Sequence, residues 1–86
     1  MNESRTIEVL LFAGASEAAD GADRVIVQSH DHITASELMK QLADQHAALA
    51  PLARRSRLAI DQRYVSSDHV IPSGAEVALI PPVSGG

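Results

Sequence analysis

The chain has 86 residues and no cysteine, with seven Lys and Arg against eleven Asp and Glu, and only 2% aromatic residues. This length predicts one domain with little room for a catalytic pocket, and the lack of cysteine excludes disulfides, cysteine zinc sites, iron–sulfur clusters and thiol nucleophiles. The acidic balance and the scarcity of aromatic residues argue against a nucleic-acid partner.

The first half of the chain predicts two strands joined by a long loop. Residues 6–13 (TIEVLLFA) are rich in β-forming side chains and place alternate apolar residues on one face, as a strand does; Gly14 is expected to end it. Residues 15–22 are small and acidic, which indicates a loop with room for one helical turn. Residues 23–29 (DRVIVQS) predict the second strand. The loop is longer than most hairpin connections.

The clearest local signal is a helix start at Thr34. Thr34 and Glu37 have the spacing of a capping box, in which a hydroxyl and a carboxylate satisfy free N–H groups of the first turn. Ala50 precedes Pro51, which disfavours helix at Ala50, so the helix is expected to stop before that point or restart after it. Apolar residues at intervals of three and four predict a helix of about twelve residues; they are Ala35, Leu38, Met39, Leu42, Ala43 and His46.

The second half predicts three more strands. Residues 57–61 form the third, and the short pair 64–65 forms the fourth after a tight turn through Gln62 and Arg63. Residues 72–74 (PSG) signal a turn, and residues 75–80 (AEVALI) alternate cleanly as the last strand.

This order of elements predicts an α+β fold with a single main helix. An amphipathic helix must bury its stripe against a sheet, the one large apolar face available. If the helix crosses over to place the last strand parallel to the first, the result is the β-grasp (ubiquitin-like) arrangement with about five strands. We therefore expect a β-grasp domain over residues 1–80, followed by a flexible tail over residues 81–86.

The tail combines a stiff exit with a permissive end. Pro81 and Pro82 each fix φ and lack an N–H donor. Gly85 and Gly86 have no Cβ, so this end can thread a narrow channel, and six extended residues span at most about 20 Å. A frayed terminus is the alternative interpretation, although two terminal glycines arise by chance in only roughly 0.5% of chains.

Several segments resemble one family. Residues 74–86 (GAEVALIPPVSGG) are similar to the C-terminal signature of the small, sulfur-carrier subunits of molybdopterin synthase. Residues 9–13 (VLLFA) resemble the first strand of that family, and residues 59–65 (AIDQRYV) resemble its central hairpin. The resemblance covers nearly the whole chain.

The resemblance implies a carrier that is not catalytic alone. In that family an ATP-dependent, ubiquitin-activating-like enzyme adenylates the terminal carboxylate, and sulfur then replaces AMP to leave a thiocarboxylate. The large synthase subunit binds the tail and uses the sulfur to build the dithiolene of molybdopterin from a cyclic pyranopterin phosphate. By this resemblance Gly86 carries the sulfur, and Gly85 and Ser84 let the tail enter. The residues implied at the partner interface are Phe12, Pro81, Pro82 and Val83. The chain itself is expected to bind no cofactor, since ATP is used by the activating enzyme.

The sequence departs from the family at two places. Ser16 and Glu17 stand where the family often has an Arg-Glu pair after the first strand. The central hairpin has Asp61-Gln62-Arg63 in place of an Asn-Gly or Asp-Gly turn. Both differences concern partner contacts and leave the chemistry of the tail unchanged.

Other functions stay open at this point. The chain could carry a thiocarboxylate for thiamine, cysteine or tRNA thiolation, modify proteins as ubiquitin does, or be an interaction module with an idle tail. The His30-Asp31-His32 run with His69 is a poor metal candidate, because zinc needs three or four converging ligands, so no metal is expected. Arg54, Arg55 and Arg57 form either a solvated surface or a docking site for an acidic partner.

The sequence also gives an expectation for location. The N-terminus lacks a basic region followed by an apolar one, so no signal peptide is expected. The longest apolar run, residues 9–13, is far shorter than the roughly 18 residues that span a bilayer. We expect a cytoplasmic protein with no membrane partner.

Overall fold

A computed structural model describes residues 4–12 and 14–82 of the chain. Its strands follow the predicted order, and the main helix lies between the second and third strands. The elements are β1 (Ser4–Leu11), α1 (Gly14–Ala18), β2 (Arg24–His30), α2 (Ala35–Gln45), a 3₁₀ turn η1 (Ala47–Leu49), α3 (Ala50–Ala53), β3 (Arg57–Ile60), β4 (Arg63–Tyr64) and β5 (Val77–Ile80).

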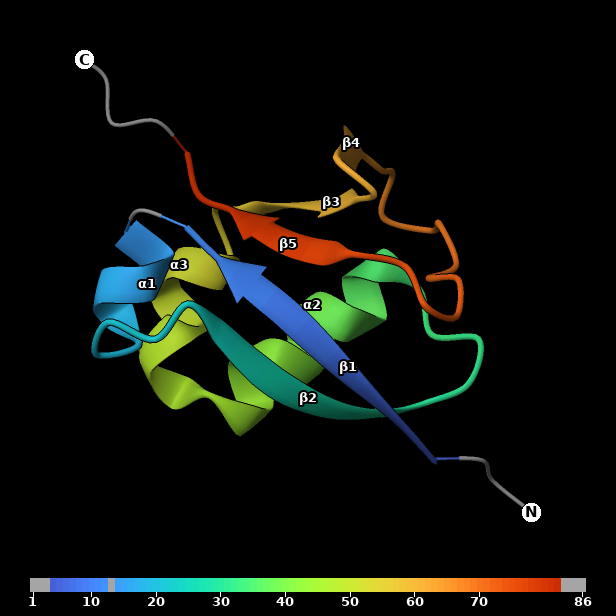
Figure 1. The fold of residues 1–86 in the computed structure, drawn as a ribbon, viewed down its shortest axis with the longest axis horizontal. Coiled ribbons are helices and arrows are strands. Elements are labelled where there is room, and N and C mark those ends of the chain that lie inside the picture. The colour runs from blue at the N-terminus through green and yellow to red at the C-terminus, as the bar shows by residue number, and fades with distance from the viewer. Residues whose placement is uncertain (1–3, 13, 83–86) are drawn as a thin grey trace.

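The strands form one mixed sheet in the order β2-β1-β5-β3-β4 (Figure 1). The two central strands, β1 and β5, run parallel, with Leu11 opposite Leu79. All other neighbours in the sheet are antiparallel. This is the predicted β-grasp fold of the α+β class, because a helical crossover joins the two halves of the sheet and brings the last strand beside the first.

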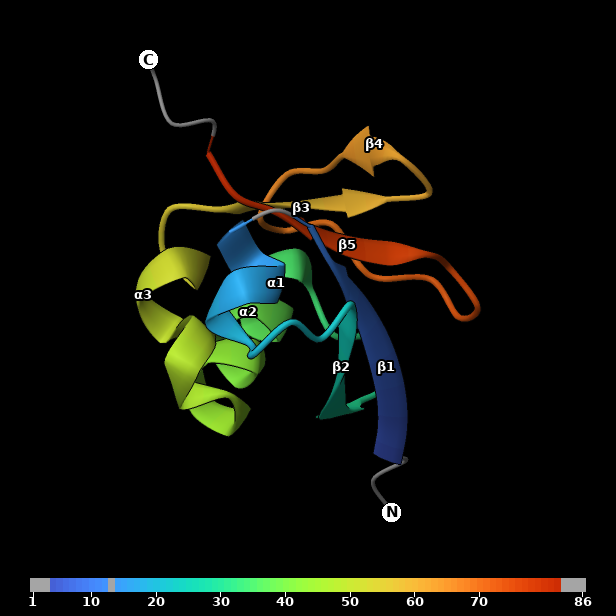
Figure 2. The ribbon, with the colours of Figure 1, turned by 60° about the vertical axis from the view of Figure 1, so that its left-hand side comes forward.

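The helices gather on one side of the sheet (Figure 2). The core lies between the helices and the sheet. Strand β1 contributes Ile7, Val9 and Leu11 to it, and these three residues form the buried face that the alternation in the sequence predicts. The buried side chains of α2 are Ala35, Leu38 and Leu42, whereas Met39 and His46 of the predicted stripe are only half-buried. The helical layer covers one face of the sheet and leaves the other face open.

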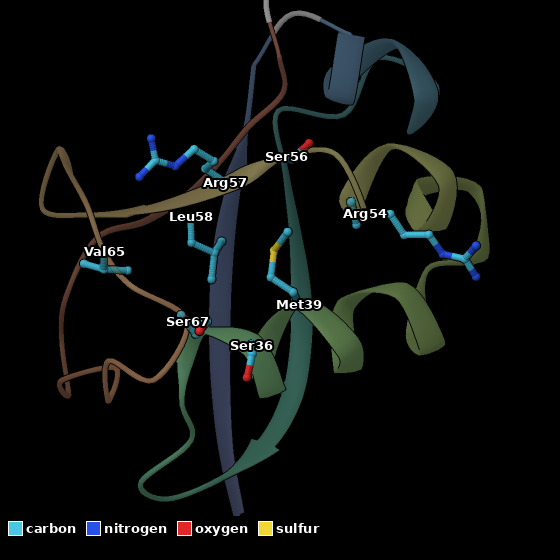
Figure 3. A pocket seen from close by; sticks show the side chains of 10 residues that line it. Ser36, Met39, Arg54, Ser56, Arg57, Leu58, Val65 and Ser67 are labelled. Carbon is cyan, nitrogen blue, oxygen red and sulfur yellow. The ribbon is translucent and has the colours of Figure 1, made fainter.

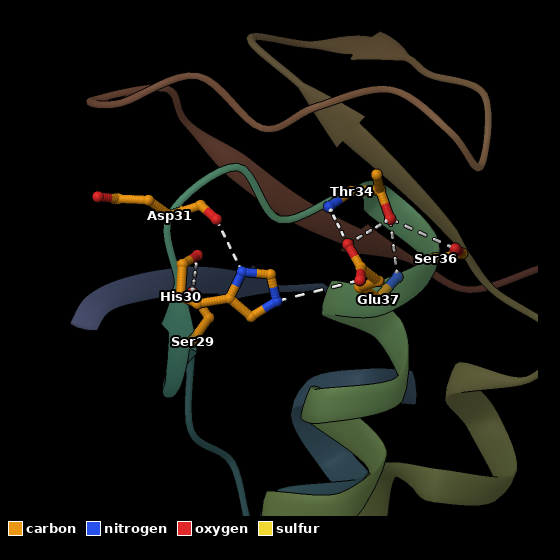
Figure 4. Close-up of polar contacts among 6 residues, drawn as sticks. All are labelled: Ser29, His30, Asp31, Thr34, Ser36 and Glu37. Atoms are coloured by element: carbon orange, nitrogen blue, oxygen red, sulfur yellow. Dashed lines mark hydrogen bonds and ion pairs between the residues drawn. The ribbon is translucent and has the colours of Figure 1, made fainter. Parts of the chain in front are cut away.

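The capping box at the start of α2 forms as predicted (Figure 4). The Glu37 N–H donates to Thr34 Oγ1 at 3.3 Å, and the Thr34 N–H donates to Glu37 Oε1 at 2.9 Å. These hydrogen bonds from the Thr34 backbone and hydroxyl hold the pKa of the Glu37 carboxyl below its usual value. The charged form of Glu37 therefore stabilises the folded state.

We expect Glu37→Gln to reduce the dependence of stability on pH. A carboxyl whose pKa is lower in the folded state contributes stability above its unfolded pKa, and this contribution is lost as the pH falls through the folded value. The gap in free energy of unfolding between wild type and the variant should therefore shrink as the pH falls below about 4.5. Urea denaturation of both proteins over an acidic pH series measures it, and a gap that stays constant would contradict the role of the charge.

Two helical segments differ from the sequence-based expectation. Gly14 begins α1 and does not end the preceding strand, since β1 already stops at Leu11. Ala50 has helical dihedrals (φ −56°, ψ −47°) although it precedes proline, because Pro51 occupies the first turn of α3, where its missing N–H costs nothing. The chain thus restarts a helix at Ala50, which brings Ala53 into the core.

The turn between β3 and β4 lies one residue earlier than predicted. Ile60 pairs with Arg63, and the two turn residues are Asp61 and Gln62, with φ of 49° and 70°. Asp61 is fixed here because its Oδ1 accepts the N–H of Glu76 at 3.0 Å, while its own N–H donates to Glu76 O at 2.9 Å. A two-residue turn with positive φ at both positions is the type I′ hairpin turn.

We expect Gln62→Gly to stabilise the protein by about 0.5–1 kcal/mol. A left-handed conformation is strained for Gln and free of strain for glycine, although glycine also loses more entropy on folding. The same substitution at Arg63, which lies in β4, should destabilise the protein instead. Urea denaturation of both variants measures the difference, and equal effects would argue against the turn position.

Candidate functional site

The face of the sheet that carries no helix is mostly apolar beside the tail. Its residues alternate with those that face the helices, and four of them form a row across the sheet, in which Ala78 pairs with both Leu10 and Ala59. Ala59 in turn pairs with Tyr64. We call this surface the open sheet face, and define it by Leu10, Phe12, Ala59, Tyr64, Ala78 and Ile80.

Both aromatic residues of the chain lie on the open sheet face. The side chains of Phe12 and Tyr64 are 50% and 57% exposed. They line a hollow of about 390 Å³ together with three apolar residues, Ala59, Ala78 and Ile80, and two polar ones, Gln62 and Glu76. Exposed aromatic side chains around a small apolar depression are the residues that most often dominate binding at protein interfaces.

Charges on this face are arranged at its borders. Arg57 lies opposite Ile80, and its guanidinium stacks 4.2 Å from the centre of the Tyr64 ring, a cation–π contact. On the far side, Arg24 Nη1 lies 2.7 Å from Glu8 Oε1. The hydrogen bond with Glu8 raises the pKa of the Arg24 guanidinium above its ordinary value. The apolar centre is thus bordered by a paired cation on β2 and a stacked cation beside the last strand.

The tail leaves the domain at the edge of this surface. Because β1 and β5 are parallel, their C-terminal ends lie at the same edge of the sheet (Figure 1), and Phe12 follows directly after Leu11, the partner of Leu79. Pro81 is half-buried and Pro82 is exposed. The predicted site residues Val83, Ser84, Gly85 and Gly86 lie outside the described residues. The structure therefore brings Phe12 close to Pro81, where the tail begins.

The sequence-based interpretation missed most of the open sheet face. It named Phe12 for the interface but not Tyr64 or Ile80, which share this surface with it. The alternation of side chains along the strand could have found them. Ala78 and Ile80 flank the buried Leu79, so both must point to the opposite face of the sheet. Which strands become neighbours could not be read from alternation alone.

The histidine residues that the sequence offered as metal ligands do not form a metal site in the described part of the chain. In the described ranges no group of three or more His, Cys, Asp or Glu residues could hold a metal ion. His30 is used locally, with Nδ1 2.7 Å from Asp31 O and Nε2 4.0 Å from Glu37 Oε2 (Figure 4).

The arginine cluster is also dispersed. A hollow of about 330 Å³ lies between α2 and β3, and Arg54 and Arg57 point away from it in opposite directions, while Met39 and Leu58 point inward (Figure 3). Arg57 thus belongs with the open sheet face and not with Arg54. No helix in residues 4–12 and 14–82 is long and apolar enough to cross a membrane.

Most of the chain matches one known protein family. The sequence model of the ThiS family matches residues 9–86, from the middle of β1 to the terminal Gly-Gly. The chain belongs to the ThiS family. The matched range of this ThiS-family chain includes Phe12, the open sheet face and the tail.

Relatives of similar length carry one name. The ThiS-family chain is 35% identical over 86 residues to the molybdopterin synthase sulfur carrier subunit of Dictyostelium discoideum, covering 96% of this chain and 99% of the relative. It is 38% identical over 82 residues to the protein of the same name from Escherichia coli (strain K12), covering 93% and 99%.

Solved structures share the architecture. SAMP1 from Haloferax volcanii matches with a TM-score of 0.77 at 27% identity, covering 95% of this chain and all of the other. A chain of the complex between subunits 1 and 2 of the molybdopterin-converting factor from Helicobacter pylori 26695 matches with a TM-score of 0.65 at 16% identity, with the same coverage, which shows a common fold. The β-grasp assignment thus agrees with independent structures.

Proposed function

We propose that this ThiS-family chain is the sulfur carrier subunit of a molybdopterin synthase. The observation that carries the proposal is end-to-end similarity, at 31–38% identity, to proteins with that name, in a chain whose last two residues are glycines. The proposed role also agrees with the composition. A chain without cysteine has no thiol that could bind sulfur, which leaves the terminal carboxylate as the carrier group.

The proposed chemistry takes place at the carboxylate of Gly86. An adenylating partner joins this carboxylate to the α-phosphate of ATP and releases pyrophosphate, since a free carboxylate is ionised and unreactive at neutral pH. Hydrosulfide then attacks the carbonyl carbon, the bond from this carbon to the AMP oxygen breaks, and AMP leaves behind a thiocarboxylate. ATP belongs to the adenylating partner, and this chain contributes the tail; both steps are proposed to occur in the cytoplasm.

The open sheet face is the proposed docking surface for the large synthase subunit. The complex from Helicobacter pylori pairs two subunits of the converting factor, and one of its chains has the present fold. The contacts that the family resemblance implies are Phe12, Pro81 and Pro82, with Val83 beyond the described residues. The proposal is supported by the pairing of Leu11 with Leu79, since Phe12 follows the first and Pro81 comes two residues after the second. Tyr64 and Ile80 extend this contact, because they line the same hollow as Phe12.

We expect Phe12→Ala to weaken binding to the large subunit by about 30-fold or more. An interface aromatic residue of the kind that dominates binding contributes roughly 2 kcal/mol or more, which corresponds to this factor. Val70→Ala is the matched control, since Val70 is similarly exposed (47%) but lies in the loop before β5. Titration calorimetry with the purified large subunit measures both variants. Equal affinities for F12A and V70A would exclude the open sheet face as the docking surface.

A second candidate function is modification of other proteins. The 27% identity and TM-score of 0.77 to SAMP1, and the match to a structure described as small archaeal modifier protein 1, favour it. In that role the Gly86 carboxylate, once adenylated, would form an isopeptide bond with a lysine amine and release AMP. Higher-mass conjugates on a denaturing gel that carry this chain would support this candidate, and free thiocarboxylated chain alone would support the carrier.

A further inference from the structure

Strand β2 forms one edge of the sheet and has β1 as its one neighbour there. Ile7 faces Val27, and Gln28 faces Thr6. In an antiparallel pair, residues alternate between those whose N–H and C=O point to the neighbour and those whose groups point outward. Gln28 and Ile26 belong to the outward set, because both bond to groups outside the sheet. Such an edge can accept another strand.

Two side chains at the end of α2 occupy these outward groups. Gln45 Oε1 accepts the Gln28 N–H at 2.8 Å, and Gln45 Nε2 donates to Gln28 O at 2.7 Å. The carboxamide of Gln45 thus makes both hydrogen bonds that the N–H and C=O of one residue in an added antiparallel strand would make. His46 Nε2 lies 2.7 Å from Ile26 O and donates to it. A further bond, from Gln45 Nε2 to Gln41 Oε1 at 3.0 Å, fixes the carboxamide in this orientation.

The opposite edge of the sheet is protected in a different way. Strand β4 has two residues, Arg63 and Tyr64, and a strand this short offers little to pair with. Strand β2 has seven residues and includes the β-branched run Val25, Ile26 and Val27, which favours strand pairing. Gln45 and His46 therefore cover β2, the edge strand that is longer and has the stronger tendency to pair with another strand.

We propose that Gln45 and His46 close the β2 edge against a second copy of this chain. An antiparallel pairing of β2 with itself, centred on Val27, places Ile26 opposite Gln28 of the second copy, and Gln28 opposite Ile26. These are the two residues whose outward groups Gln45 and His46 occupy. A twofold pair of this kind uses the same surface on both copies, so one uncovered edge is sufficient for dimer formation. The inference is independent of sulfur transfer.

The test is the state of association of Gln45→Ala/His46→Ala in the full chain. Sedimentation velocity over a range of concentrations should show wild type as a monomer and the double variant as a monomer–dimer equilibrium. Asp44→Ala is the control, since Asp44 is an exposed neighbour in the last turn of α2. It should remain monomeric. Circular dichroism confirms that each variant is folded, and Gln45→Ala alone replaces the double variant if the latter unfolds.

A second measurement places the contact at β2. Hydrogen exchange of the Gln28 amide should be faster than wild type in dilute double variant and should slow again as the dimer forms. Adding Ile26→Lys, which brings a charge to this edge, should restore the monomer. A folded double variant that stays monomeric at high concentration would overturn the proposal, as would a dimer that Ile26→Lys leaves intact or a wild type that already pairs through β2.

Discussion

A chain that lacks Gly86 fails to take up sulfur. Incubated with the adenylating partner, ATP and a sulfur donor, the full chain should gain about 16 Da, the exchange of one oxygen for sulfur, while the truncated chain should gain nothing. Removing one residue withdraws the carboxylate by about 3.5 Å, so we expect it to fall short of the ATP held by the adenylating partner. Intact-mass spectrometry measures both products.

The control for this experiment keeps the carboxylate in place. Val70→Ala changes an exposed loop residue and leaves the whole tail with both terminal glycines unchanged, so it should load sulfur to the wild-type level. Sulfur uptake by the chain without Gly86 would show that the terminal residue is not the carrier group. If neither the full chain nor V70A is loaded by a partner that is competent on another carrier, the proposed function is refuted.

Leu79→Ala should destabilise the protein by about 3 kcal/mol, one of the largest effects of a single core substitution. Leu79 is fully buried in the central strand β5, between Leu11 of β1 and Leu58 of β3. A change of this size should lower the melting temperature by roughly 10–25 °C in a domain of this length. Small domains have thin margins of stability, so a loss of this size is a large fraction of the free energy of unfolding.

Two controls separate the cavity from other effects of this substitution. Leu79→Met nearly conserves volume and should cost less than about 1.5 kcal/mol. Val70→Ala removes atoms from an exposed side chain and should change stability by less than about 0.5 kcal/mol. Calorimetry on the three variants gives the comparison, and a loss in L79A no greater than that in V70A would contradict the role of Leu79 in the core.

The elements that the sequence predicted well are those fixed by neighbouring residues. The start of α2 depends on Thr34 and Glu37, three residues apart, and the buried face of β1 depends on simple alternation. Both signals are complete within a few residues. The pairing of a helical layer with a single sheet then followed, since one amphipathic helix needs one large apolar face to cover.

The elements that the sequence missed depend on distant contacts. The position of the β3–β4 turn is fixed by hydrogen bonds between Asp61 and Glu76, fifteen residues apart. The role of Tyr64 in the open sheet face depends on Ala59 and Ala78 being its neighbours across the sheet. Neither relation could be read from the local pattern, and the interface was therefore predicted from the tail and Phe12 alone.

The parallel pairing of β1 with β5 fixes the point from which the tail starts, and so limits how far its end can reach. The last residue of β5, Ile80, is held in the middle of the sheet and cannot shift without breaking its pairing with Arg57. The six residues that follow it span at most about 20 Å. An enzyme that acts on the carboxylate of Gly86 should therefore hold its reactive atoms within that distance of Ile80. Partners of different architecture should share this upper limit on the distance.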